Sequence, residues 1–65
     1  MYEVLYNDYS THDVCTSLKE AHDLAEKLSK YNRGSIYVMN GETGAIVCEF
    51  INRRGVITKR DHSEF

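Results

Sequence analysis

The fold is decided by residues 35–51, which read SIYVMNGETGAIVCEFI. Ser35 to Met39 and Ala45 to Ile51 are rich in β-branched and aromatic side chains, which favour strands. Between them, the sequence Asn40-Gly41-Glu42-Thr43-Gly44 contains glycines that can adopt a positive φ, as a tight turn requires. This stretch therefore predicts a β-hairpin.

The second strand of the predicted hairpin is apolar on both faces. Successive side chains of a strand point to opposite faces of a sheet. One face then carries Ala45, Val47, Glu49 and Ile51, and the other carries Ile46, Cys48 and Phe50. A strand that is apolar on both faces usually lies in the middle of a sheet or beneath a second cover. We therefore expect this strand inside a sheet.

A helix precedes the hairpin. Apolar residues recur at steps of three and four, so on a helix they fall within an arc of about 140°. This stripe consists of Leu18, Ala21, Leu24, Ala25, Leu28 and Tyr31. Ser17 followed by Glu20 fits a capping box, and Gly34 can supply the left-handed residue that ends a helix. The pattern predicts a helix with boundaries near residues 17 and 33 and with Tyr31 in the core.

The exposed side of this helix carries acid and base residues four positions apart. Such pairs contribute a few tenths of a kcal/mol each. The expected pairs are Asp23 with Lys27 and Glu26 with Lys30.

Further strands flank these elements. Residues 1–6 alternate with the period of a half-buried strand, Thr11 to Cys15 predict a returning edge strand, and Val56 to Lys59 predict a short last strand. The expected fold is α+β, with one helix on one face of an antiparallel sheet of four to five strands. The expected element order is strand, strand, helix, strand and strand, and Val56 to Lys59 would add a fifth strand. We expect residues 1–60 to form a single domain and residues 61–65 a flexible tail.

Length and composition exclude several classes of protein. A folded chain of 65 residues buries only about 60% of its surface, so it has one thin core and no room for a deep cofactor cavity. We expect no cofactor, whether organic or metallic. No apolar run approaches the ~20 residues that span a bilayer, and no signal peptide is visible, so we expect a cytoplasmic protein without a membrane partner. Cys15 and Cys48 form no Cys-x-x-Cys motif and are expected to be reduced.

A single helix can shield only one side of the sheet. The other side then exposes apolar residues, and an open apolar face on a small protein marks an association surface. Tyrosines, Tyr9 among them, add large contact area at low entropic cost. The expected protein interface consists of Tyr2, Tyr6, Tyr37, Met39, Val47 and Ile51. We expect a homodimer or a complex with another protein.

The alternative is a nucleic-acid-binding protein. Residues 52–60 contain no acid but several basic side chains, which could contact phosphates while Tyr37 or Phe50 stacks on bases. The candidate contacts are Arg53, Arg54, Lys59 and Arg60. The net charge of −2 and the pI near 5.8 argue against a general nucleic-acid binder.

Catalytic and metal sites are not indicated. His12, His22 and His62 lack the convergent spacing that zinc requires. Cys15 precedes the predicted helix, where the helix dipole would lower its pKa, whereas burial would raise the pKa of Cys48. Glu49 is expected to face solvent. No acid, base and oxyanion group can be recognised together, so we expect no enzyme.

In layout, the chain resembles small uncharacterised bacterial and phage proteins built as two strands, a helix and two strands. The resemblance covers residues 1–51 and rests on the element order, the helix pattern from Ser17 to Tyr31 and the hairpin turn at Asn40 to Gly44. Some phage proteins of this size and layout bind and inhibit a host enzyme. The resemblance implies a phage-encoded protein that acts on a host protein. Together with the uncovered sheet face, this leads us to expect a small non-enzymatic protein-binding or regulatory module that associates through an open sheet face.

Overall fold

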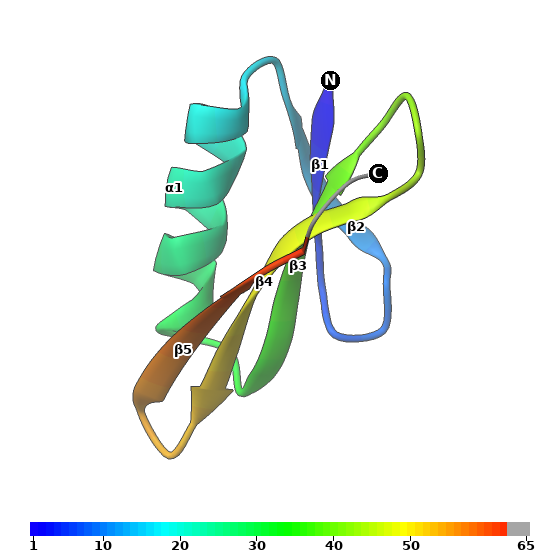
Figure 1. Cartoon of the computed structure of the whole chain (residues 1–65). Coiled ribbons are helices and arrows are strands. Elements are labelled where there is room, and N and C mark those ends of the chain that lie inside the picture. The colour runs from blue at the N-terminus through cyan, green and yellow to red at the C-terminus, as the bar shows by residue number, and fades with distance from the viewer. Residues whose placement is uncertain (63–65) are drawn as a thin grey trace.

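The protein forms one helix and a five-stranded antiparallel sheet, in a computed structural model that describes residues 1–62. The strand order is β2-β1-β3-β4-β5, and α1 packs on one face of the sheet (Figure 1). The elements are β1 (Tyr2–Leu5), β2 (Thr11–Cys15), α1 (Leu18–Ser29), β3 (Gly34–Asn40), β4 (Ile46–Arg53) and β5 (Val56–Asp61). The predicted α+β fold is confirmed, with all five predicted strands present.

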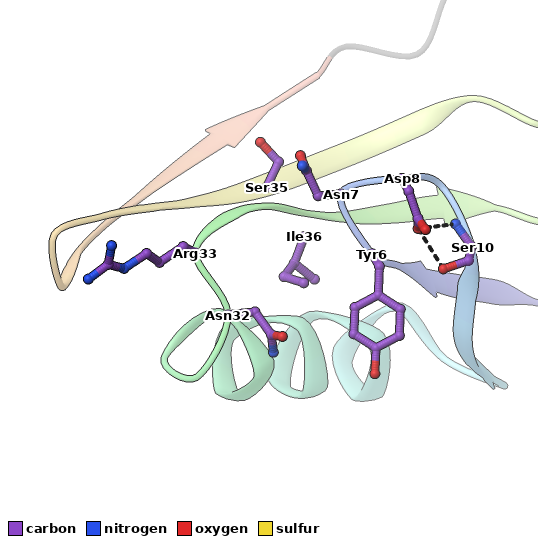
Figure 2. Close-up of a pocket in the computed structure, with 8 residues that line it drawn as sticks. All are labelled: Tyr6, Asn7, Asp8, Ser10, Asn32, Arg33, Ser35 and Ile36. Atoms are coloured by element: carbon purple, nitrogen blue, oxygen red, sulfur yellow. Dashed lines mark hydrogen bonds between the residues drawn. The ribbon is translucent and has the colours of Figure 1, made fainter.

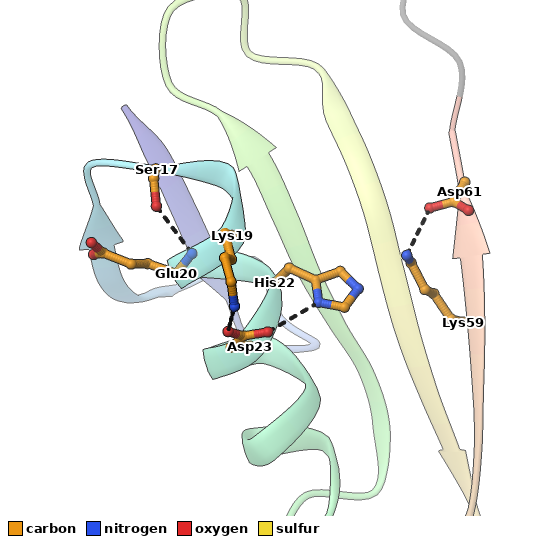
Figure 3. Close-up of polar contacts among 7 residues, drawn as sticks. All are labelled: Ser17, Lys19, Glu20, His22, Asp23, Lys59 and Asp61. Atoms are coloured by element: carbon orange, nitrogen blue, oxygen red, sulfur yellow. Dashed lines mark hydrogen bonds and ion pairs between the residues drawn. The ribbon is translucent and has the colours of Figure 1, made fainter.

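The helix begins where the sequence predicts. Ser17 has extended backbone angles, and its hydroxyl oxygen accepts the N–H of Glu20 at 3.1 Å (Figure 3). This bond satisfies one of the amides that the first turn of a helix leaves unpaired. At 12 residues, α1 is short, and within residues 1–62 no helix has the length and apolar character needed to cross a membrane.

The helix ends earlier than predicted, and the expectation for Tyr31 is wrong. The last helical residue is Ser29, and the Lys30 N–H donates to the Lys27 carbonyl at 3.3 Å in a tightened final turn. Because Tyr31 lies beyond this turn, it leaves the apolar stripe and is 80% exposed. Gly34, with a φ of 92°, begins β3 instead of directly capping the helix.

The exposed ion pair of α1 also differs from the expected pairs. Lys19 Nζ lies 3.0 Å from the Asp23 carboxylate, and Figure 3 shows Asp23 between Lys19 and His22. Asp23 can reach a lysine one turn earlier or one turn later, and it pairs with the earlier one. The hydrogen bond from Lys19 lowers the pKa of Asp23, but exposed pairs of this kind contribute little to stability.

The core lies between α1 and the middle strands. Val4, Val38 and Cys48 form a row of neighbours across β1, β3 and β4, and Ala21 and Ala25 face them from the helix. The small alanine side chains let the helix approach the sheet closely. The buried cluster consists of Val4, Cys15, Ala21, Ala25, Ile36, Val38, Cys48 and Phe50.

Asn52 ties the end of α1 to the β4–β5 hairpin. Its side chain is 6% exposed, donates to the Ser29 carbonyl at 2.5 Å and accepts the Gly55 N–H at 3.0 Å. Arg54 and Gly55 form the turn with φ values of 55° and 84°, as a two-residue hairpin of type I′ requires. One buried amide therefore satisfies backbone groups of both the helix and the turn.

The last strand is longer than predicted. β5 runs through Asp61, and the His62 N–H continues the ladder by donating to the Val47 carbonyl at 2.8 Å. Of the tail expected at residues 61–65, Asp61 therefore belongs to the sheet, and residues 63–65 lie outside the described residues.

Candidate functional site

The two faces of the sheet differ in what covers them. Ile36 and Val38 pack in the core under α1, so the intervening Tyr37 and its neighbour Met39 lie on the opposite face. We call this side, which α1 does not cover, the open face. By alternation and register it carries Glu3, Leu5, Thr11, Val14, Ser35, Tyr37, Met39, Glu49, Ile51, Arg53, Val56, Thr58 and Arg60.

The structure divides the predicted protein interface between the two faces. Tyr37, Met39 and Ile51 are half-buried on the open face. Tyr2 and Tyr6 instead pack against the core cluster on the helix side. Val47 is half-buried beside an irregularity in the β3–β4 register. Alternation in the sequence groups Tyr2 with Tyr6, but it does not reveal which face of β1 the helix covers.

Tyr9 adjoins the open face, because its ring contacts that of Tyr37 there. It lies in the β1–β2 turn with a φ of 67°, although bulky side chains rarely adopt this left-handed conformation. Its ring stacks on that of Tyr37, with the ring centres 4.9 Å apart and the planes 16° from parallel. The proximity of Tyr37 raises the pKa of Tyr9. Tyr9 remains 62% exposed, so the stacked pair presents an aromatic surface to solvent.

Glu49 does not face solvent, contrary to the sequence-based expectation. It is 9% exposed, and its Oε1 lies 3.1 Å from Nε2 of His62. Its cross-strand neighbours are Tyr37 and Arg60. A buried carboxylate needs such partners because desolvation penalises an isolated charge. The sequence did not reveal this contact because it depends on β5 continuing far enough to bring His62 alongside Glu49.

The basic residues of the candidate nucleic-acid site do not form one surface. Arg53 and Arg60, with Ile51 and Thr58, line a shallow hollow of about 280 Å³ on the open face. Lys59 pairs with Phe50 in the ladder, lies on the helix side of β5 and contacts Asp61 at 3.3 Å (Figure 3). Arg54 lies in the hairpin turn. Because side chains alternate along β5, only two of the four basic residues, Arg53 and Arg60, lie together on the open face.

The histidines take part in separate contacts. The His12 ring meets Tyr6 edge-on at 5.2 Å, His22 meets Phe50 at 5.1 Å, and His62 meets Glu49. Among residues 1–62, no group of three or more histidine, cysteine or acidic residues is placed to hold a metal ion.

Both cysteines are buried and reduced. Burial raises the pKa of the Cys15 thiol, and the charges of Asp13 and Glu20 raise it further. The expectation that the start of the helix would lower this pKa is therefore wrong, and desolvation by burial is the largest cause of the rise. Burial also raises the pKa of Cys48, as expected. Neither thiol is activated as a nucleophile.

A hollow of about 460 Å³ lies at one end of the sheet, between the β1–β2 turn and the loop after α1. Figure 2 shows its lining residues, which are Tyr6, Asn7, Asp8, Ser10, Asn32, Arg33, Ser35 and Ile36. The Asp8 carboxylate accepts the Ser10 N–H at 3.0 Å and the Ser10 hydroxyl at 2.6 Å, and this lowers its pKa. Arg33 extends away from Asp8 (Figure 2). Asp8 therefore stabilises a turn, and the lining side chains do not converge as an acid–base pair would.

Comparisons with known proteins return no relative. No protein-family model matches the chain, and no curated protein and no solved structure matches it.

Proposed function

We propose that this protein is a non-enzymatic, cytoplasmic protein-binding module that docks on a partner protein through the open face. The observation that carries the proposal is the exposed Tyr9 ring, stacked on Tyr37 and held there by a left-handed backbone. Such a conformation costs about 1–3 kcal/mol in a residue other than glycine, and strained residues of this kind cluster at functional sites.

The chemistry of the open face supports a protein partner. Tyrosine, methionine and arginine are enriched at protein interfaces. Tyr37, Met39 and Ile51 provide contact area in the middle of the face, and Arg53 and Arg60 lie beside them. Glu49 is paired with His62, so a docked partner would not trap it as an isolated charge.

The layout of the chain extends the proposal to its biological role. Some small phage proteins of similar layout bind and inhibit a host enzyme. We therefore propose a phage-encoded regulator whose partner is a host protein.

Affinity capture with matched tyrosine variants tests the proposal. The wild-type chain, Tyr37→Ala and Tyr31→Ala would each be used to capture proteins from a cell lysate, followed by mass spectrometry. Tyr31 is the control because it is 80% exposed but lies outside the open face. We expect the wild type and Tyr31→Ala to retain the same partner and Tyr37→Ala to lose it. Equal capture by all three chains would exclude the open face as the docking surface.

The second candidate function is binding of single-stranded nucleic acid. It is favoured by the hollow in which Arg53 and Arg60 lie on the same face as the exposed Tyr9–Tyr37 pair. Fluorescence anisotropy with a labelled oligonucleotide, measured over a range of salt concentrations, tests it. Arg60→Glu should abolish binding, whereas Lys59→Glu, on the other face, should weaken it less. If neither substitution nor the salt concentration changed the affinity for the oligonucleotide, nucleic-acid binding through this face would be excluded.

A further inference from the structure

The two edges of the sheet are protected to different degrees. At the β2 edge, the pairing with β1 is interrupted by a register shift at Val4/Leu5, and the Asp13 carboxylate accepts the Val14 N–H at 2.8 Å. A bulge, and an edge N–H that is already bonded to a side chain, discourage a further strand from pairing. At the other edge, β5 pairs with β4 in unbroken register from Val56 to Asp61. β5 is therefore the edge that is geometrically ready to accept another strand.

The ladder between β4 and β5 shows which backbone groups of β5 are free. His62 donates its N–H to Val47, so the even-numbered residues of β5 form the hydrogen-bonded pairs with β4. The odd-numbered residues Ile57, Lys59 and Asp61 then direct their N–H and C=O groups away from the sheet. No hydrogen bond to these amide groups is found within residues 1–62.

The helix leaves room beside this edge. α1 packs on β1, β2, β3 and β4, and a hollow of about 310 Å³ separates it from β5. The hollow is lined by Glu26, Lys30, Phe50, Ile57 and Lys59. A strand added beyond β5 would therefore meet no obstruction from the helix.

The charges on β5 indicate which strand would fit. In a two-fold antiparallel pair centred on Thr58, Ile57 would face Lys59 of the second copy. If the pair is centred on Lys59, two lysines face each other, and the β4 neighbour of each, Phe50, carries no opposite charge. In the pair centred on Arg60, each Lys59 faces Asp61 of the other copy, and opposite charges across a strand pair are favourable. The two Arg60 side chains then face each other on the open face as like charges, which the carboxylate of Glu49, the β4 neighbour of each Arg60, offsets.

We propose that two copies of this chain pair through their β5 strands, in the two-fold antiparallel register that places Lys59 opposite Asp61. Within one chain, Lys59 Nζ lies 3.3 Å from the Asp61 carboxylate, and the Asp61 side chain is 78% exposed. Both charged groups can therefore form the same ion pair with the second copy instead. The dimer has one continuous sheet with both helices on one face and both open faces on the other. The second copy thereby doubles the docking surface without covering it.

Charge exchange across the pair tests the register. The dissociation constant would be measured by sedimentation equilibrium for the wild type, Lys59→Asp, Asp61→Lys and the double exchange. Each single change places like charges opposite each other and should weaken the dimer about tenfold, and the double exchange should restore it. A double exchange as weak as the single changes, or a wild type that stays monomeric at every concentration, would overturn the proposal.

A cross-linking experiment tests the same register independently. In the proposed pair, Arg60 meets Arg60 of the second copy at a non-hydrogen-bonded position, where the Cα atoms lie about 4.5 Å apart, within disulfide range. Under mild oxidation, Arg60→Cys should form a covalent dimer and the control Thr58→Cys should not. Background from Cys15 and Cys48 is low because both are buried. Efficient cross-linking of Thr58→Cys instead would overturn the register.

Two further variants distinguish a dimer that forms through the β5 edge from one that forms through the open face. Lys59→Pro removes an N–H that points away from β4, so it should leave the fold intact, as judged by circular dichroism, and abolish the dimer. Tyr37→Ala should leave the dissociation constant of the dimer unchanged. Self-association that survives Lys59→Pro but is lost in Tyr37→Ala would show that the copies meet through the open face, and would overturn the proposal. The inference is independent of the proposed function, since either can fail alone.

Discussion

The covered face and the open face are made by alternate residues of the same strands. On β3, Ile36 and Val38 are 1% and 0% exposed beneath the helix, whereas Tyr37 and Met39 on the other side are half-buried. The covered face is apolar and closely packed, whereas the open face combines the stacked Tyr9 and Tyr37 rings with arginines and a paired carboxylate. Because most of the buried apolar side chains lie on the covered face, we expect that face to supply most of the folding free energy.

The largest effect on stability is expected on the covered face. Phe50→Ala should lower the free energy of unfolding by about 3–5 kcal/mol, because it removes a large side chain that is 2% exposed. Its neighbour Ile51, on the open face, is the matched control. Ile51→Ala should cost clearly less in urea unfolding. Equal losses at both positions would show that the two faces contribute alike to stability.

A smaller loss is expected from the buried amide that joins the helix to the last hairpin. Asn52→Ala leaves the Ser29 carbonyl and the Gly55 N–H without their partner, which should cost about 1–3 kcal/mol. Thermal unfolding measures the loss. Arg53→Ala, one residue further along and exposed, is the control and should stay within about 0.5 kcal/mol of the wild type.

Replacement of Tyr9 should separate binding from stability. Tyr9→Gly relieves the left-handed backbone but loses the stacking on Tyr37, and these effects are of similar size, so stability should change by about 1 kcal/mol or less. Partner capture should be lost. If Tyr9→Gly retains full capture, the aromatic pair is not part of the docking surface.

The smallest effect concerns alkaline pH. Because burial raises the pKa of Cys15 above 9.0, the folded state favours the neutral thiol, and this contribution is complete below the ordinary thiol pKa and lost as the pH rises through the raised value. The free energy of unfolding should therefore fall less steeply above about pH 9 in Cys15→Ala than in the wild type. Identical slopes would contradict a raised pKa.

Local patterns in the sequence accounted for much of the fold. The Ser17 cap, the glycine-rich hairpin turn and the alternation along β4 each depend on neighbours within a few residues, so they could be recognised without the structure. The end of α1 could not be predicted, because the chain turns at Lys30 to bring the Ser29 carbonyl to Asn52, which is 23 positions away.

The candidate site was predicted less well than the fold. The position of Tyr37, Met39 and Ile51 on the open face was predicted from the alternation along the two strands of the hairpin. Glu49 was misjudged because its partner His62 is 13 positions away in the sequence. Tyr9 was recognised only as one of several tyrosines, since neither its left-handed backbone nor its stacking on Tyr37 has a signature in a single sequence.

The sequence by itself determined the element order, the α+β class and the presence of more apolar strand surface than one helix can cover. These properties follow from local periodicity and composition. Only the tertiary structure decided which face the helix covers, and thereby that Tyr2 and Tyr6 pack against the core, that Arg60 lies on the open face and Lys59 on the helix side, and that Glu49 is buried. The reason is physical: alternation specifies which residues share a face, but the side that is buried depends on contacts between strands and a helix that are distant in the chain.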